Sequence, residues 1–255
     1  MHRGRVEHVV FSPDGNLAAS TSTILIELRP ARGELRIWKT DSGEAVGAID
    51  LEIGAFSRPV FAHDGKALLF PQIKRVPGAD ENYAASVELY RIPEWKHLQT
   101  LAISGRVMSA ALHPNGKALM LAGVMRAQSG IQGPGKIWLA DLGDGEVEEL
   151  DTSDFAVFNH VQYAGPEDRF LFGTTTDIEL GRDGRSVLPR QAKVVMRSDR
   201  TGREIWTSTS EDDRKDVQAI AVSPDGELVA WCTYGTILIL DAQRGRLLHG
   251  IGVFE

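Results

Sequence analysis

The chain of 255 residues contains a single cysteine, Cys232, so no internal disulfide can form. It also lacks any run of about 18 consecutive apolar residues, the length that a membrane-spanning helix needs. The first residues, from Met1 onward, contain no apolar core of the kind found in secretory signals. These absences predict a cytoplasmic protein that does not enter a membrane. Cys232 lies in the apolar run 228–232 and is expected to be a buried, inert thiol.

An excess of basic residues is absent as well. The chain has 35 acidic and 28 basic residues, which gives a formal net charge of −7. Binding along a nucleic acid requires a basic field that displaces counterions from the phosphates. We therefore expect no nucleic-acid partner.

The common catalytic signatures are missing. The sequence has no Gly-x-Ser-x-Gly elbow, no phosphate-binding Gly-x-x-x-x-Gly-Lys-Ser/Thr loop and no Gly-x-Gly-x-x-Gly dinucleotide turn. Its seven histidines lie in different parts of the chain and form no pair with zinc-site spacing. We expect no cofactor and no metal, and we expect His63 and His113, which lie in equivalent turns, to be solvated.

A short turn recurs at intervals of 50 to 58 residues. In its first and last copies it reads Ser-Pro-Asp-Gly, and its five copies are residues 12–15, 62–65, 113–116, 165–168 and 223–226. Proline fixes φ, Asp or Asn caps the turn through its side chain, and glycine adopts positive φ, so the turn joins two antiparallel strands. Repetition at such a period indicates a repeat architecture.

Each copy of the turn lies between two β-type runs, and a third run, a second turn and a fourth run follow it. Five such units predict one all-β domain over residues 1–255, a β-propeller of five four-stranded antiparallel blades. The expected blades are residues 1–51, 52–104, 105–152, 153–211 and 212–255. A pair of β-sandwiches would not explain five copies of one turn. Part of a larger, seven-bladed propeller and an open or dimer-completed arc remain as alternatives.

The repeats resemble the WD-repeat family and its bacterial relatives over nearly the whole chain, most clearly in the fifth unit. Residues 222–226 lie where that family has its aspartate-glycine turn, and residues 234–241 lie where it has its Trp-Asp pair. Trp38 occupies the tryptophan position of the first unit, where Lys39 replaces the family's aspartate. The resemblance implies a propeller scaffold, more often one of seven blades.

Members of this family often stabilise a blade with a buried network of His, Ser or Thr, Asp and Trp. The resemblance places His2, Ser20 and Trp38 in three of these positions of the first unit and Arg32 in the fourth. Because Arg32 cannot replace the acid, the network is expected to be partial or absent.

The inner strands of a propeller begin around its central channel. Aligning the repeats on their turns places polar side chains at these strand starts, notably Glu7, His8, Arg58, Asn159 and His160. A packed channel favours small apolar residues, so these five are candidates for a binding site at the channel mouth. Solvated polar groups without a ligand are the alternative interpretation.

Long connections between the second and third strands form the other candidate surface. They span residues 73–84 in the second unit, 126–135 in the third and 177–192 in the fourth, and the last carries Arg182, Arg185 and Arg190. Long connections on a rigid scaffold are commonly functional. Mixed charges on such loops suit the docking of a protein segment.

These features predict a non-enzymatic scaffold that binds a protein or peptide through the loop-bearing face and the channel mouth, with self-association if the ring is open. The alternative is a propeller hydrolase, similar to lactonases or glycosidases, with an axial site. Such enzymes need a bound metal or at least two carboxylates. Glu7 is the only acid among the aligned residues at the starts of the inner strands, which disfavours the hydrolase alternative.

Overall fold

The structure is a computed structural model. It describes residues 2–26, 29–52, 58–75, 83–92, 94–126, 132–153, 157–165, 169–176, 179–180, 187–188, 191–198, 202–210 and 217–252. Within these ranges the chain forms strands and turns and contains no helix, hence none that could cross a membrane.

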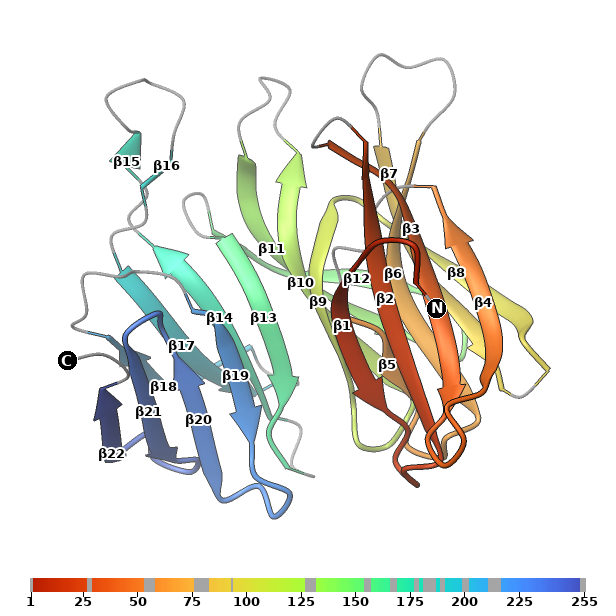
Figure 1. The fold of residues 1–255 in the computed structure, drawn as a ribbon. Coiled ribbons are helices and arrows are strands. Elements are labelled where there is room, and N and C mark those ends of the chain that lie inside the picture. Colours follow the sequence, from red (N-terminus) through yellow and green to blue (C-terminus); the bar gives the residue numbers. More distant parts are fainter. Residues whose placement is uncertain are drawn as a thin grey trace. The chain divides into compact units, whose positions relative to one another are not determined.

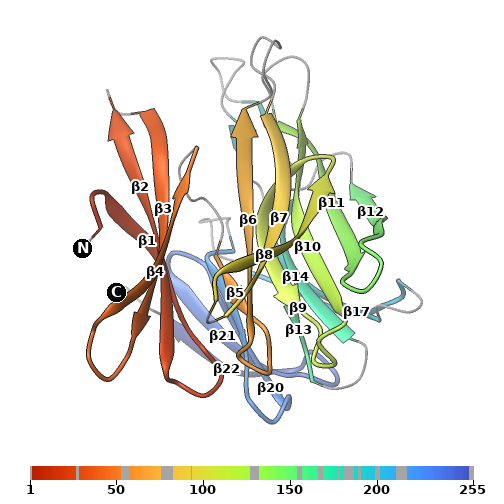
Figure 2. The same ribbon diagram turned by 90° about the vertical axis from the view of Figure 1, so that its right-hand side faces the viewer.

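The strands form five four-stranded sheets, each made of strands that are consecutive along the chain apart from one inserted ribbon (Figure 1). Blade one comprises β1 (Arg5–Phe11), β2 (Leu17–Ile26), β3 (Arg29–Lys39) and β4 (Ala45–Leu51). Blade two comprises β5 (Val60–Phe61), β6 (Ala67–Arg75), β7 (Tyr83–Arg91) and β8 (Lys96–Ile103). Figure 2 shows β1 to β4 side by side.

The remaining blades follow the same order. Blade three comprises β9 (Arg106–Leu112), β10 (Ala118–Arg126), β11 (Gln132–Asp141) and β12 (Val147–Ser153). Blade four comprises β13 (Val157–Tyr163), β14 (Arg169–Thr176), β17 (Gln191–Ser198) and β18 (Glu204–Thr209), and β15 (Glu179–Leu180) and β16 (Val187–Leu188) form a ribbon inserted between β14 and β17. Blade five comprises β19 (Ala219–Val222), β20 (Leu228–Cys232), β21 (Thr236–Asp241) and β22 (Leu247–Gly252).

The predicted fold class is confirmed: the described residues are all-β and form five four-stranded antiparallel sheets, the arrangement of a five-bladed β-propeller. The chain divides into two compact units, residues 1–110 with 140–147 and residues 111–139 with 148–255. The assignment of residues 1–255 to one domain stays a prediction.

Each unit has a core between the faces of successive blades. In the first unit, Ala19 and Ile37 of blade one pack with Phe61 of blade two. In the second unit, one cluster joins blades three and four and another joins blades four and five, the latter through residues such as Met196 and Trp231. Strand side chains alternate between the two faces of a sheet, so burial of both faces requires the nearly continuous apolar runs seen in the sequence.

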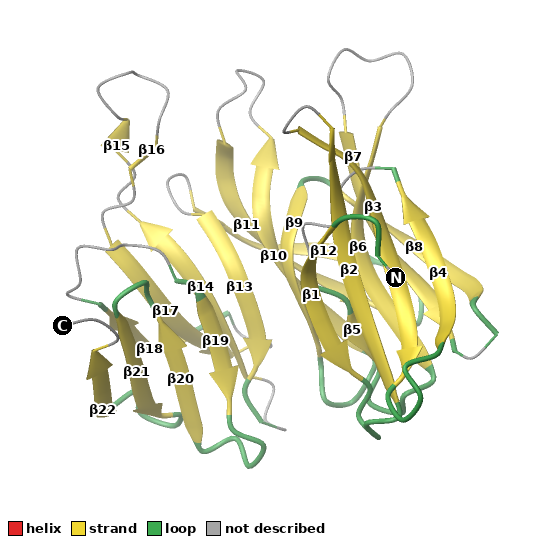
Figure 3. Ribbon diagram, in the orientation of Figure 1, coloured by secondary structure: helices red, strands yellow, loops and turns green. Residues whose placement is uncertain are grey.

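The short turns close in the predicted way. Ser12 N donates to Leu17 O at 2.8 Å, Gly15 N donates to Ser12 O at 2.9 Å, and Gly15 has a φ of 72°. Hydrogen bonds lower the pKa of the Asp14 carboxyl, and the bond from Ser12 Oγ has a larger effect than those from Asn16. Figure 3 shows that the turn linking β1 to β2 lies at the same end of blade one as the turn linking β3 to β4.

His113 departs from the expectation of a solvated turn residue, whereas His63 is exposed as expected. The His113 ring is buried, because Tyr163 of blade four meets it edge-on with 4.6 Å between the ring centroids. Its Nδ1 accepts a hydrogen bond from Asn115 N at 3.1 Å. The His113 ring thus accepts a hydrogen bond within its own turn.

Blade two has Trp95 at the turn position where the other blades have Gly43, Gly145, Gly202 and Gly245. Trp95 has a φ of 53°, a left-handed conformation that costs a residue with a side chain roughly 1–2 kcal/mol. Its indole lies directly against Gly47 of blade one, and Nε1 donates to Val46 O at 3.0 Å. The contact between the blades offsets the strain in the turn.

Candidate functional site

The structure places a β-bulge at two of the predicted site positions. In β1 the register with β2 shifts between Val6 and His8, so Glu7 has no partner residue in the ladder. In β13 the register shifts between Phe158 and His160, which leaves Asn159 in the equivalent place. A bulge redirects a side chain relative to the pleat and is frequent beside functional sites. Glu7-His8 and Asn159-His160 are therefore structurally equivalent pairs, which the alignment of the repeats had indicated.

The predicted site residues differ in their burial and lie in both compact units. Glu7 is partly buried and forms an ion pair with Arg5 at 3.2 Å, and Arg58 is exposed just before β5. Glu7, His8 and Arg58 belong to the first unit, and Asn159 and His160 belong to the second. Their convergence on one channel mouth stays a prediction. The predicted arginines of blade four, which are Arg182, Arg185 and Arg190, lie outside the described residues.

One end of blade four carries both a bulge and an inserted ribbon. Phe158, next to the bulge, pairs with Thr174, two residues before β14 ends at Thr176. The chain then forms β15 and β16, which pair with each other through Glu179–Leu188 and Leu180–Val187 (Figure 1). The predicted long connection thus contains ordered secondary structure at the end of the blade where β13 begins.

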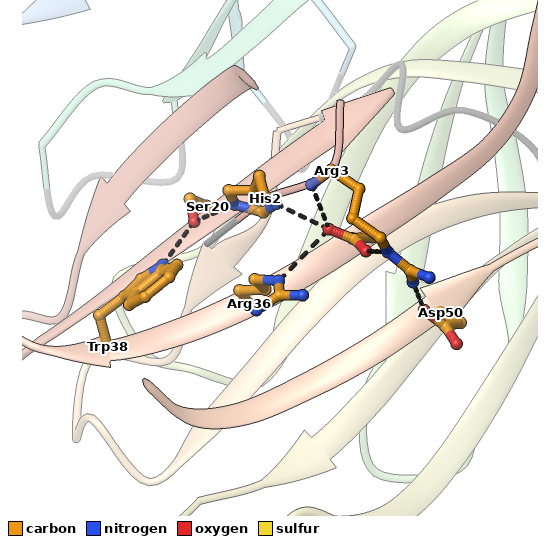
Figure 4. Close-up of polar contacts among 7 residues, drawn as sticks. His2, Arg3, Ser20, Arg36, Trp38 and Asp50 are labelled. Carbon is orange, nitrogen blue, oxygen red and sulfur yellow. Dashed lines mark hydrogen bonds and ion pairs between the residues drawn. The ribbon is translucent and has the colours of Figure 1, made fainter. Parts of the chain in front are cut away.

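Blade one contains a continuous polar network on the face that points away from blade two (Figure 4). Trp38 Nε1 donates to Ser20 Oγ at 2.6 Å, and Ser20 Oγ lies 2.6 Å from His2 Nε2. His2 Nδ1 lies 3.3 Å from Glu34 Oε2. A neutral His2 with its proton on Nδ1 satisfies every group, because it donates to Glu34 and accepts from Ser20.

The network corrects one expectation. The resemblance to WD-repeat proteins assigned its fourth position to Arg32, but Glu34 supplies the acid, so the network is complete rather than partial. Glu34 and Arg36 are two residues apart on β3 and therefore share a face with Trp38. This alternation within an apolar strand was the signal that sequence reasoning missed.

Glu34 is almost fully buried and is surrounded by cations. Burial by itself would raise its pKa, but hydrogen bonds from the Arg3 side chain and backbone, and then from Arg36, lower the pKa to about 2. Arg3 N donates to Glu34 Oε2 at 3.2 Å, the Arg3 guanidinium binds Oε1, and Arg36 Nε donates to Oε2 at 3.3 Å. Arg3 also reaches Asp50 at 3.1 Å. The N-terminal segment is thereby fastened to β3 and β4.

Burial lowers the pKa of His2 below 6.5, and this effect exceeds the opposing effect of Glu34. The network consequently holds a neutral imidazole beside an ionised carboxylate. All four side chains are engaged with one another, so the arrangement stiffens the blade face rather than presenting a reactive group.

Blade two contains a second buried carboxylate that the sequence did not single out. Glu88 Oε1 accepts from Ser86 Oγ at 2.8 Å and also from Gln72. Glu88 Oε2 accepts from Thr100 Oγ1 at 2.6 Å and lies 2.7 Å from His97 Nε2. These contacts link three neighbouring strands, β6, β7 and β8, and satisfy both oxygens.

Within the described ranges, no three His, Cys, Asp or Glu side chains come together in a way that could hold a metal ion. Cys232 is partly exposed rather than fully buried.

No protein-family model matches the chain, and no curated protein matches its sequence.

Proposed function

We propose that this chain is a non-enzymatic interaction scaffold that binds a protein or peptide at the blade end where the inner strands begin. The observation that supports the proposal is the construction of this end in blade four, where the bulge at Asn159 and the paired strands β15 and β16 occur together. Ordered insertions on a rigid β-scaffold are typical positions for recognition. The candidate binding residues are Glu7, His8 and Arg58 in the first unit and Asn159 and His160 in the second.

The charges at this end favour a peptide partner with acidic residues. Arg58 is exposed before β5, and the sequence places Arg182, Arg185 and Arg190 between β14 and β17. Arginine binds carboxylates through two parallel hydrogen bonds, which suits it to a protein segment with acidic side chains. The opposite blade end consists of tight turns whose side chains mainly satisfy their own backbone.

Charge reversal at the two ends tests the proposal. The chain is immobilised and used to capture proteins from cells that express it, with the captured proteins quantified by mass spectrometry. We expect Arg58→Glu, and separately Arg182→Glu with Arg185→Glu, to reduce capture of the same proteins at least about tenfold, the effect of losing one strong charged contact.

The matched controls are Lys66→Glu and Lys117→Glu, because both lysines are exposed at the short-turn end. The controls are expected to leave capture unchanged, and all variants are expected to keep the melting temperature of the parent. Equal capture by the test variants and the controls would contradict the proposal.

A further inference from the structure

Blade three contains the only Asn-Gly pair of the sequence, in the short turn between β9 and β10. Asn115 precedes Gly116, whereas the other three asparagines precede larger residues. Glycine has no Cβ, so its backbone nitrogen can approach a neighbouring group closely. Asn115, Gly116 and Lys117 are all exposed to solvent. The Asn115 side-chain amide is therefore open both to water and to the backbone nitrogen that follows it.

The turn holds the Asn115 side chain in a position that favours attack. Lys117 N donates to Asn115 Oδ1 at 2.8 Å, which folds the side chain back toward the peptide group that joins it to Gly116. The same donor polarises the side-chain carbonyl and stabilises negative charge on Oδ1 when a nucleophile adds to Cγ. Gly116 has a φ of 72°, and apart from its chain neighbours no described atom lies within 4 Å of the place that a Cβ would take. The reacting carbonyl is thus activated and held beside the nitrogen that can attack it.

One hydrogen bond restrains the attacking nitrogen. Gly116 N donates its proton to His113 O at 2.8 Å, and this bond closes the turn. The His113 ring is itself held in place by Tyr163 and by the hydrogen bond that its Nδ1 accepts from Asn115 N. Gly116 N must leave its bond and lose its proton before it can attack, because only the deprotonated nitrogen is a nucleophile. The folded turn therefore slows the attack by the cost of one hydrogen bond and does not abolish it.

The equivalent turns of three other blades accept a carboxylate at this position. Blades one, two and five have aspartate there, namely Asp14, Asp64 and Asp225. In each, the carboxylate accepts a hydrogen bond from the backbone nitrogen two residues later, at 3.1, 2.9 and 3.0 Å, as Asn115 Oδ1 does. Hydrogen bonds to a carboxylate are stronger than those to a neutral amide. Conversion of Asn115 to aspartate thus keeps the bond that shapes the turn.

We propose that Asn115 is a deamidation site of this chain. Gly116 N attacks Asn115 Cγ, a C–N bond forms, and the side-chain nitrogen leaves as ammonia, so that residues 115 and 116 share a succinimide ring. Water then adds to one of the two ring carbonyls and opens the ring, which leaves aspartate or isoaspartate at position 115. Water is the only co-reactant, and no electron is gained or lost overall. Either product lowers the formal net charge from −7 by one.

The deamidation site is distinct from the proposed partner site. Residues 113–116 form the short turn of blade three, whereas the partner is proposed to bind at the blade end where the inner strands begin. Deamidation needs no partner, so either proposal can fail without the other.

Peptide mapping of the purified chain tests the proposal. The folded chain and a sample unfolded in urea are incubated in the same mildly alkaline buffer, and circular dichroism confirms that the first stays folded. Trypsin releases residues 107–117, a peptide in which Asn115 is the only asparagine, and mass spectrometry follows the increase in mass when oxygen replaces the amide nitrogen. We expect this increase in both samples, about tenfold slower in the folded chain because one hydrogen bond must open. The rate is expected to rise with pH in both samples, because the attacking nitrogen must lose its proton.

Two variants and two other asparagines provide the controls. Asn115→Gln keeps a side-chain amide but places it one methylene farther from Gly116 N, so we expect no increase in mass. Asn115→Asp carries the charge of the product and marks where the modified parent chain is expected to elute on ion exchange. Asn16 and Asn159 are expected to stay unchanged in the folded chain. If the folded chain shows no increase in peptide 107–117 by the time the unfolded sample has reacted fully, or an equal increase at Asn16 or Asn159, the proposal is overturned.

Discussion

The contact between Trp95 and Gly47 gives the sharpest prediction for stability. Replacing a fully buried Trp by a small residue costs about 3–5 kcal/mol, and Trp95 is only partly buried, so we expect a packing loss of about 2 kcal/mol. The lost hydrogen bond to Val46 O adds about 1 kcal/mol. Glycine removes the left-handed strain, which returns about 1 kcal/mol. Trp95→Gly is therefore expected to destabilise the protein by about 2 kcal/mol.

Thermal and urea denaturation measure this change. For a chain of 255 residues, about 2 kcal/mol corresponds to a decrease in melting temperature of about 4–8 °C. If Trp95→Gly raises the melting temperature instead, strain outweighs packing and the contact between the blades does not stabilise the fold.

A double-mutant cycle with Gly47→Ala isolates the contact. A Cβ at position 47 would overlap the indole of Trp95, so Gly47→Ala alone is expected to cost about 1–3 kcal/mol. In the Trp95→Gly background the indole is gone, and the same substitution is expected to be nearly neutral. The two changes thus couple by about 1–3 kcal/mol. An equal cost of Gly47→Ala in both backgrounds would refute the reasoning.

Two further predictions concern the buried carboxylates. The pKa of Glu34 is lowered from 4.5 to about 2, so its contribution to stability is present above pH 4.5 and is lost as the pH falls toward 2. The largest contribution to stability that this shift allows is about 3 kcal/mol, and because Arg3 is 63% exposed we expect about 1–2 kcal/mol. Glu34→Gln should remove this contribution and flatten the acid limb of a curve of stability against pH. An unchanged acid limb would contradict the prediction. Glu88→Gln is expected to lower the free energy of unfolding in urea denaturation by about 2–3 kcal/mol, because a glutamine amide keeps only one of the two oxygens that accept hydrogen bonds from Gln72, Ser86 and Thr100. The exposed control Glu94→Gln should change this free energy by less than about 0.5 kcal/mol. Equal changes in stability for Glu88→Gln and Glu94→Gln would show that the buried Glu88 carboxylate does not stabilise blade two.

Much of the fold was predictable from the sequence because its determinants are local. The turn at Ser12–Gly15 depends on residues within one tetrapeptide, and the alternation of side chains in strands such as β3 depends on backbone geometry alone. The alignment of Glu7 with Asn159 follows from this register, and both occur at bulges. Their predicted convergence on one channel mouth depends on how the blades are placed, which no local pattern contains.

The sequence alone determined that the chain has five repeat units, the order of strands within each unit and the end of each unit at which the short turns lie. Tertiary structure decided that Glu34 completes the network of His2 and that Trp95 packs on Gly47. The physical reason is the range of the interactions. Turns and pleats are set by neighbouring residues, whereas burial and pairing of side chains require strands distant in sequence to come together in register.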